Sequence, residues 1–201
     1  MLLWINGPFG GGKTHTAYEL CRRLPGSVVS DPEHFGTGLQ RMLPRDKRRD
    51  FQDFPSWRQG VHEVLSHLLD QHTAGGPVIV PMTVVVPQYF EETVGRLRAD
   101  GYDVRHFSLL AHRETVLRRL QGRGLRGLRS EQWAATRVDR CLEALSKPEF
   151  GEHLTTDHLT VSGAAEAVAR SAGLRLRPDD SGPLARRLHR AQVTVKNIRP
   201  L

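Results

Sequence analysis

Residues 7–14 read Gly-Pro-Phe-Gly-Gly-Gly-Lys-Thr, a spacing of residue types that suits the binding of phosphate groups. The run fits the pattern G-x-x-x-x-G-K-[ST], in which the backbone amides of a glycine-rich loop surround the phosphates of a nucleotide. We expect Lys13 to reach the β- and γ-phosphates and the hydroxyl of Thr14 to hold Mg²⁺. The loop therefore predicts ATP and Mg²⁺ as cofactors. The expected nucleotide-binding residues of the loop are Gly7, Gly10, Gly11, Gly12, Lys13 and Thr14.

The elements around the loop are those that such a motif requires. An apolar run precedes it, and the residues after it place Ala17, Leu20, Cys21 and Leu24 on one face of a helix. Further apolar runs alternate with amphipathic stretches, which predicts a parallel sheet covered by helices. We therefore expect a three-layer α/β domain of the P-loop NTPase type with a five-stranded parallel sheet. The expected strands are residues 2–6, 27–30, 77–82, 104–109 and 153–156.

The stretch between the second and third expected strands, residues 34–73, has the character of a substrate-side excursion. Residues 34–55 are rich in Pro, Gly and charge and are expected to be irregular. Ser56 is expected to begin a helix, with Gln59 completing a capping box. The expected buried face of this helix consists of Trp57, Val61, Val64, Leu65 and Leu68.

The spacing of the glycines narrows the class of nucleotide-binding protein. G-x-x-G-x-G-K-T is a variant associated with small-molecule and nucleotide kinases. A regulatory GTPase would carry [NT]-K-x-D downstream, which is absent. A mechanical ATPase would end a hydrophobic strand with Asp-Glu, where this chain has Pro81-Met82-Thr83. The pattern favours a kinase of the nucleotide- or shikimate-kinase type.

Asp31 is the notable carboxylate outside the loop. It follows the second expected strand, at the carboxyl edge where ligands bind in open α/β sheets. There it could orient or deprotonate an acceptor hydroxyl. Because Asp-Pro favours turns, Asp31 could instead cap the turn that follows it.

Arginines supply the remaining candidates. Eight lie between residues 113 and 140, and glycines interleave with them over residues 121–130, which are expected to form an arginine-rich lid. In this lid Arg123 is expected to stabilise charge on the transferring phosphoryl group, and Arg119, one turn earlier, to assist nucleotide binding. Arg41 and Arg58 are weaker candidates for contacts with the acceptor.

The composition limits the classes of partner and metal site that are expected. The net charge is +7, but no aromatic-rich strand or DNA-reading helix accompanies it, so a nucleic acid is not expected. Ten histidines without ligand spacing and two distant cysteines predict neither a metal site formed by them nor a disulfide. The apolar start is too short to span a membrane and lacks the features of a signal peptide, so a cytoplasmic protein is expected.

Several runs along nearly the whole chain resemble the tunicamycin resistance ATP-binding proteins of bacteria. This resemblance implies an ATP-binding protein with a kinase-like fold that confers resistance to tunicamycin, a fatty-acylated uridine antibiotic. It places the nucleotide site at the loop residues given above and makes phosphorylation of the drug the natural expectation. The runs are WINGPFGGGKT (4–14), DPEHFG (31–36), IVPMTVVVPQYF (79–90), ETVLRRL (114–120), VDRCLEALSKPEF (138–150), TTDHL (155–159) and VTVKNIRPL (193–201).

Residues 182–201 form a basic tail, and the family has been linked to membranes through this part of the chain. Leu184, Leu188, Ala191 and Val195 follow a helical spacing beside arginines, which could lie on an anionic membrane surface. The same spacing also fits a closing helix packed on the domain. We expect residues 1–201 to form one domain.

Two other functions stay open at this point. The chain could be a binding protein that sequesters the drug, with ATP setting its conformation. It could also be a housekeeping kinase whose acceptor is a common nucleotide or sugar acid.

Overall fold

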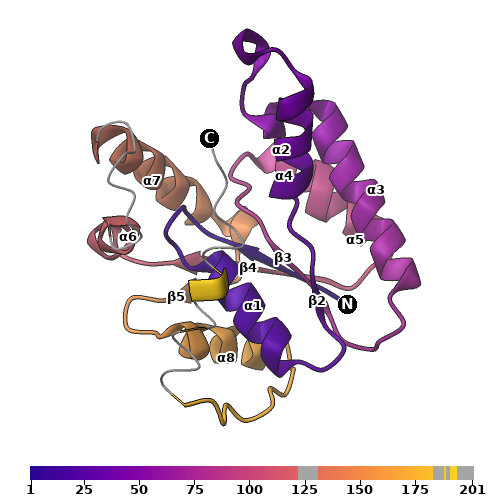
Figure 1. Ribbon diagram of the computed structural model, residues 1–201, viewed down its shortest axis with the longest axis vertical. Helices are drawn as coiled ribbons and strands as arrows, with labels where there is room; N and C mark the ends of the chain where they lie inside the picture. The colour runs from indigo at the N-terminus through magenta and orange to yellow at the C-terminus, as the bar shows by residue number, and fades with distance from the viewer. Residues whose placement is uncertain (122–130, 183–187, 189–190, 194–201) are drawn as a thin grey trace.

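The structure is a computed structural model that describes residues 1–121, 131–182, 188 and 191–193. At its centre lies a five-stranded parallel sheet with strand order β2-β3-β1-β4-β5 (Figure 1). In register, Ile5 lies opposite Pro81 on one neighbour and Phe107 on the other. The five-stranded parallel sheet expected from the sequence is confirmed. Its strands are β1 (Leu2–Asn6), β2 (Val28–Val29), β3 (Val78–Pro81), β4 (Val104–Leu110) and β5 (His153–Thr155).

Helices cover both faces of the sheet, as Figure 1 shows. On one face α1 (Lys13–Arg23) and α8 (Val161–Ser171) pack on Leu3 and Ile5 of β1. On the other, α3 (Pro55–Gln71) packs on Leu2 and Trp4, together with a helical stretch divided into α4 (Pro87–Phe90), the π-helical turn η3 (Glu91–Gly95) and α5 (Arg96–Ala99). Alternate residues of β1 thus serve two separate cores, as the period of a buried strand requires.

The helices α6 (Arg113–Gln121) and α7 (Glu131–Leu145) lie side by side beyond the carboxyl end of β4 (Figure 1). Buried Val116 and Val138 join them in a small apolar cluster of their own. An ion pair of 2.8 Å between Arg113 and Asp139 also links them. The predicted lid falls between these helices. Its residues 122–130, Arg123 included, lie outside the described residues.

The expectation that residues 34–55 are irregular is wrong for much of the segment. It contains α2 (Glu33–Met42) and the short 3₁₀ turns η1 (Arg45–Lys47) and η2 (Phe51–Asp53). Gly36 is poor for helix formation, but a side chain there would place its Cβ 2.4 Å from the ring of Phe51. The packing of η2 on α2 therefore requires a glycine at position 36, although glycine has a low helix propensity and argues against a helix in the sequence.

The capping box expected at Ser56 is also wrong, because α3 begins one residue earlier with Pro55 in its first turn and no side-chain cap. Gln59 donates to Glu63 instead. Val64 is 54% exposed rather than buried, while Trp57 and Leu65 are buried as expected. Val64 lies on the flank of the stripe formed by these residues, where a cavity adjoins α3.

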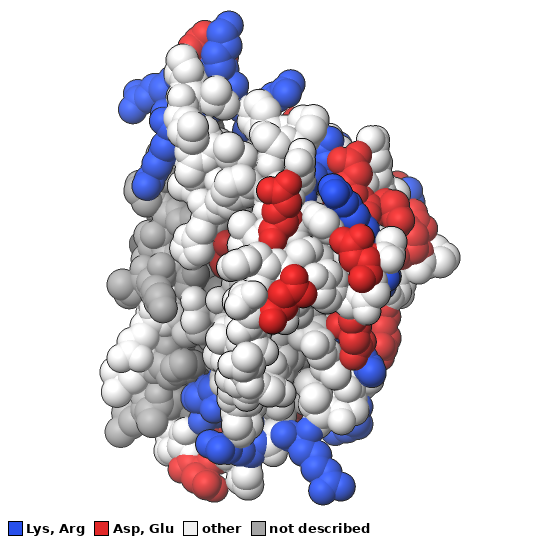
Figure 2. Space-filling view, turned by 90° about the vertical axis from the view of Figure 1, so that its right-hand side faces the viewer, with Lys and Arg blue, Asp and Glu red and all other residues white. Residues whose placement is uncertain are grey.

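Figure 2 shows a face of the molecule on which acidic and basic side chains are mixed, with Lys and Arg gathered at its upper and lower ends. Residues 45–49 alone contribute four exposed basic side chains. Among the helices that the structure describes, none combines the length and apolarity that crossing a bilayer requires. In the tail, Leu184 and Val195 lie outside the described residues, and Leu188 is 64% exposed. Contact of the tail with a membrane stays a prediction.

Candidate active site

The glycine-rich loop connects the end of β1 to the start of α1 at the carboxyl edge of the sheet. Gly10 and Gly12 have φ angles of +79° and +94°, which side-chain-bearing residues rarely adopt. A Cβ at Gly12, the residue that precedes α1, would meet no atom within 4 Å. The first turn of α1 contains no acidic residue. The amino end of α1 therefore faces open space, which suits an anion.

Lys13, the first residue of α1, is 7% exposed. Its ammonium group donates to the carbonyl of Pro8 at 3.1 Å and lies 5.7 Å from the centre of the Phe9 ring. The side chain thus lies along its own loop, where phosphate oxygens would be strong acceptors for it.

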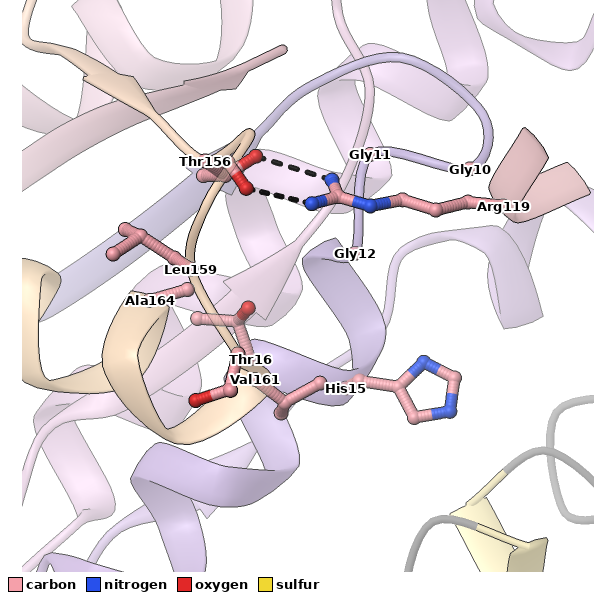
Figure 3. A pocket seen from close by; sticks show the side chains of 11 residues that line it. Gly10, Gly11, Gly12, His15, Thr16, Arg119, Thr156, Leu159, Val161 and Ala164 are labelled. Atoms are coloured by element: carbon pink, nitrogen blue, oxygen red, sulfur yellow. Dashed lines mark hydrogen bonds between the residues drawn. The ribbon is translucent and has the colours of Figure 1, made fainter. Parts of the chain in front are cut away.

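A cavity of about 310 Å³ opens beside this loop (Figure 3). Arg119 of α6 extends toward it, and its guanidinium donates to the hydroxyl and the carbonyl oxygen of Thr156 at 3.1 and 2.6 Å. The Thr156 hydroxyl in turn donates to Leu110 at 3.0 Å. Arg119, a nucleotide-site candidate from the sequence, therefore shares a cavity with the loop glycines. The cavity is lined by Gly10, Gly11, Gly12, His15, Thr16, Arg119, Thr156, Leu159, Thr160, Val161 and Ala164.

The side chain of Asn6 fixes the start of the loop. Its Oδ1 accepts hydrogen bonds from the backbone N–H groups of Gly7 and Val84, at 2.9 and 3.1 Å. Its Nδ2 donates to the Val84 carbonyl at 2.8 Å and lies 3.2 Å from Nε2 of His106. The hydroxyl of Thr83 donates to the Gly7 carbonyl at 2.8 Å. The loop, the chain after β3 and strand β4 are therefore joined by buried hydrogen bonds.

His106 completes this network in its neutral form. Because Oδ1 of Asn6 accepts two backbone N–H groups, its Nδ2 must be the donor to Nε2, and Nδ1 of His106 then carries the proton toward the Gly151 carbonyl, 3.2 Å away. Burial lowers the pKa of His106 from 6.5 to about 4, against the opposing effect of the Gly151 carbonyl. The ring is therefore uncharged near neutral pH.

Asp31 lies just beyond β2, two strands from β1, which corresponds to about 10 Å across the sheet. One of its carboxylate oxygens accepts the backbone N–H of Glu33 at 3.0 Å, so it caps the turn into α2. Asp31 lines a second cavity of about 340 Å³ between β2, α2 and α3, and this cavity shares no lining residue with the first. Its role toward an acceptor stays a prediction.

The two other arginine candidates occupy different surroundings. Arg58 is 6% exposed, forms an ion pair with Glu92, donates to the carbonyl of Gln52 and lies 4.3 Å over the ring of Tyr89. Arg41 is exposed in the last turn of α2. The structure joins neither of them to the loop, and their contacts with an acceptor stay predictions.

Sequence reasoning counted Arg137 of α7 within the arginine cluster of residues 113–140 but assigned it no role. It lies 5.4 Å from the Phe9 ring centre and forms a 3.5 Å ion pair with Asp50. No local pattern identifies this pair, because 87 residues separate its members. The presence of Phe9 inside the loop was a usable signal, since an aromatic ring there invites cations.

Comparison with known proteins agrees with this geometry. Residues 2–148 match the family described as AAA domain. The chain is similar to the tunicamycin resistance protein of Deinococcus radiodurans, with 33% identity over 89% of this chain and 100% of that one, and a TM-score of 0.74. The curated proteins include no match to the chain.

Two kinases share the fold at low identity. A sugar kinase from Janibacter sp. HTCC2649 is 18% identical, with 86% of this chain and 94% of that one covered and a TM-score of 0.58. A gluconokinase from Sinorhizobium meliloti 1021 is 15% identical, with 94% and 96% covered and a TM-score of 0.53. These two similarities show a P-loop kinase-like fold. The similarity to the Deinococcus protein establishes the family. The chain belongs to the tunicamycin resistance protein family and carries its nucleotide-binding P-loop in an AAA domain.

Proposed function

We propose that this protein transfers the γ-phosphoryl group of ATP to a hydroxyl of a nucleoside antibiotic of the tunicamycin class. One observation carries the proposal: the amino end of α1 and the guanidinium of Arg119 border the same cavity, at the carboxyl edge of the sheet. The name of the Deinococcus relative supports the choice of acceptor. The kinase neighbours support the reaction only through their fold.

The residues present fit Mg·ATP. The loop amides and Lys13 would hold the phosphates, Arg119 would border the rest of the nucleotide, and the hydroxyl of Thr14 would supply an oxygen ligand of the kind that Mg²⁺ prefers. When bound, ATP supplies the phosphoryl group, and Mg²⁺ neutralises part of its charge. No acidic side chain in the first turn of α1 opposes this charge.

On the acceptor side we assign Asp31 to orienting the hydroxyl and Arg123 to the transferring group. Arg41 and Arg58 are the candidates for holding the rest of the acceptor. The ends of β2 and β1 are about 10 Å apart with β3 between them, so an acceptor would lie across the end of β3 to reach both Asp31 and the loop. The proposal treats residues 1–201 as one domain, with a lid at 121–130.

The test is product mass. Purified protein with Mg·ATP and tunicamycin is expected to yield phosphorylated drug and an equal amount of ADP. Lys13→Ala is expected to abolish both, and Asp31→Asn to lower the rate strongly while leaving drug binding intact. Asp46→Asn is the matched control, because Asp46 is an exposed carboxylate of the same excursion. The absence of any phosphorylated drug from the wild-type reaction refutes the proposal.

The contact between Asp31 and Glu33 favours a second function, ATP-dependent sequestration of the drug. A carboxylate that caps a turn, in a cavity separate from that of the loop, serves structure as well as it serves chemistry. Sequestration predicts protection in proportion to the amount of protein, and protection that survives Asp31→Asn but not Lys13→Ala. Turnover of many drug molecules by each protein excludes it.

A further inference from the structure

The ring of Phe9 lies near two cationic side chains. The ammonium of Lys13 is 5.7 Å from the ring centre, and the guanidinium carbon of Arg137 is 5.4 Å from it. Because both distances share the ring centre, the two cations are no more than about 11 Å apart. Phe9 is 44% exposed, so this arrangement lies at the accessible surface of the loop.

Arg137 reaches this place from α7, on the side of the loop that faces the excursion. Its guanidinium forms the 3.5 Å ion pair with Asp50, the residue before η2. One turn further along α7, burial raises the pKa of the Cys141 thiol, while the positive charges of Lys13, Arg137 and Arg140 oppose this increase and Asp50 adds to it. The thiol is thus within electrostatic range of Lys13 and Arg137, which places them around one region between the loop, α7 and residue 50.

A guanidinium at this position suits a phosphate better than it suits its present partners. Both members of the pair with Asp50 are about 40% exposed, and ion pairs of such exposure hold weakly. The planar fork of arginine matches the oxygens of a phosphate, and charge-assisted hydrogen bonds to them are stronger. In such loops the lysine at the position of Lys13 contacts the β- and γ-phosphates. Of these, the γ-phosphate is the terminal group and extends furthest toward the acceptor.

We propose that Arg137 binds the γ-phosphate of ATP, held ready for it by the ring of Phe9 and by Asp50. The proposal deepens the function proposed above, but it rests only on the binding of ATP at the loop. It requires no transfer of phosphate to an acceptor. Arg137 would therefore distinguish ATP from ADP at this site.

The test compares affinities for ADP and for the non-hydrolysable β,γ-imido analogue of ATP, measured by titration calorimetry with Mg²⁺. Arg137→Gln is expected to weaken the analogue about tenfold or more and to leave ADP within about twofold. Retained ADP affinity also shows that the variant is folded. Arg137→Lys is expected to recover part of the loss, because it restores the charge without the fork.

Arg96→Gln is the matched control, because Arg96 is an exposed arginine of α5, on the face of the sheet opposite α1, and the change removes the same charge. It is expected to leave both affinities unchanged within about twofold. Phe9→Leu is expected to weaken the analogue less than Arg137→Gln does, since it loosens the position of the cation without removing it.

Equal affinity changes for the two nucleotides in Arg137→Gln, or no change in either, overturn the proposal. A protein that loses only analogue affinity in Arg137→Gln, yet never phosphorylates tunicamycin, keeps Arg137 at the γ-phosphate and refutes the phosphotransferase. The two results are therefore separable.

Discussion

The two sides of the P-loop are held by different kinds of contact. At the base of the loop and beside the nucleotide cavity the contacts are buried or partly buried: the side chain of Asn6 bonds to Gly7 and Val84, and Arg119 donates to both oxygens of Thr156. Toward the acceptor, half-exposed side-chain pairs between distant segments connect α7 with the excursion, with Arg137 and Asp50 as the example. The first side is organised before any ligand arrives, whereas the second can exchange its partners at small cost. The four predictions below test this difference.

The largest effect is expected from Lys13→Ala. The change removes charge-assisted bonds to two phosphates and is expected to weaken ATP binding about a thousandfold, while the fold persists. Calorimetric titration with ATP and circular dichroism measure the two quantities. Lys47→Ala, a change of an exposed lysine in η1 on the acceptor side, is the control and is expected to leave ATP binding unchanged. Comparable losses in the two variants contradict a preformed nucleotide side.

Asn6→Ala is expected to lower the free energy of unfolding by about 3 kcal/mol, because it leaves buried partners on Gly7, Val84 and His106 without their hydrogen bonds. Thr83→Val removes a single bond from the same region and is expected to cost about 1 kcal/mol. Urea denaturation measures both. If Asn6→Ala costs no more than Thr83→Val, the network does not organise the loop.

His106, which contacts Asn6 at the base of the loop, makes this region sensitive to acid. Its pKa of about 4 in the folded protein lies below the ordinary value of 6.5, so the unfolded chain binds the proton more readily. The contribution of this residue to stability is complete above pH 6.5 and is lost as the pH falls toward about 4. It is expected to decline by about 2 kcal/mol at pH 5.

The difference in unfolding free energy between wild type and His106→Gln isolates this residue from the other histidines. It is expected to shrink as the pH falls from 7 to 5. A difference that is constant over this range contradicts the neutral, buried ring.

The smallest effect is expected on the acceptor side. Asp50→Asn breaks the pair with Arg137 and is expected to change the free energy of unfolding by less than about 1 kcal/mol. Thermal or urea denaturation measures the change. A loss of 2 kcal/mol or more would mean that the contacts on the acceptor side stabilise the fold as strongly as the buried contacts around Asn6 do.

The same difference explains how far the sequence alone could lead. The loop motif, the strand before it and the alternation of apolar runs are local signals, so the sheet and the nucleotide side follow from them. The sequence did not predict helix α2, because Gly36 lowers helix propensity. The ring of Phe51, which leaves no space for a side chain at position 36, is brought there only by the tertiary fold. Val64 shows a similar limit, since periodicity places it near a buried stripe but cannot show that a cavity adjoins it in the fold.

The acceptor side was the least predictable part. Arg137 and Asp50 are far apart in sequence, and neither belongs to a motif that would select it among 29 basic and 22 acidic residues. Asp31 was selected for its place at the strand end. The structure confirms that place and adds the bond to Glu33, which the sequence had offered only as an alternative.

The direction of the hydrogen bonds around Asn6 constrains which residues can replace one another in this family. An aspartate at position 6 could still accept from Gly7 and Val84, but it could not donate to Nε2 of His106. The proton on Nδ1 faces Gly151, so the ring cannot simply reverse its polarity without losing that partner. Homologues that change residue 6 are therefore expected to change residue 106 as well, and the two positions should covary even though they lie on different strands.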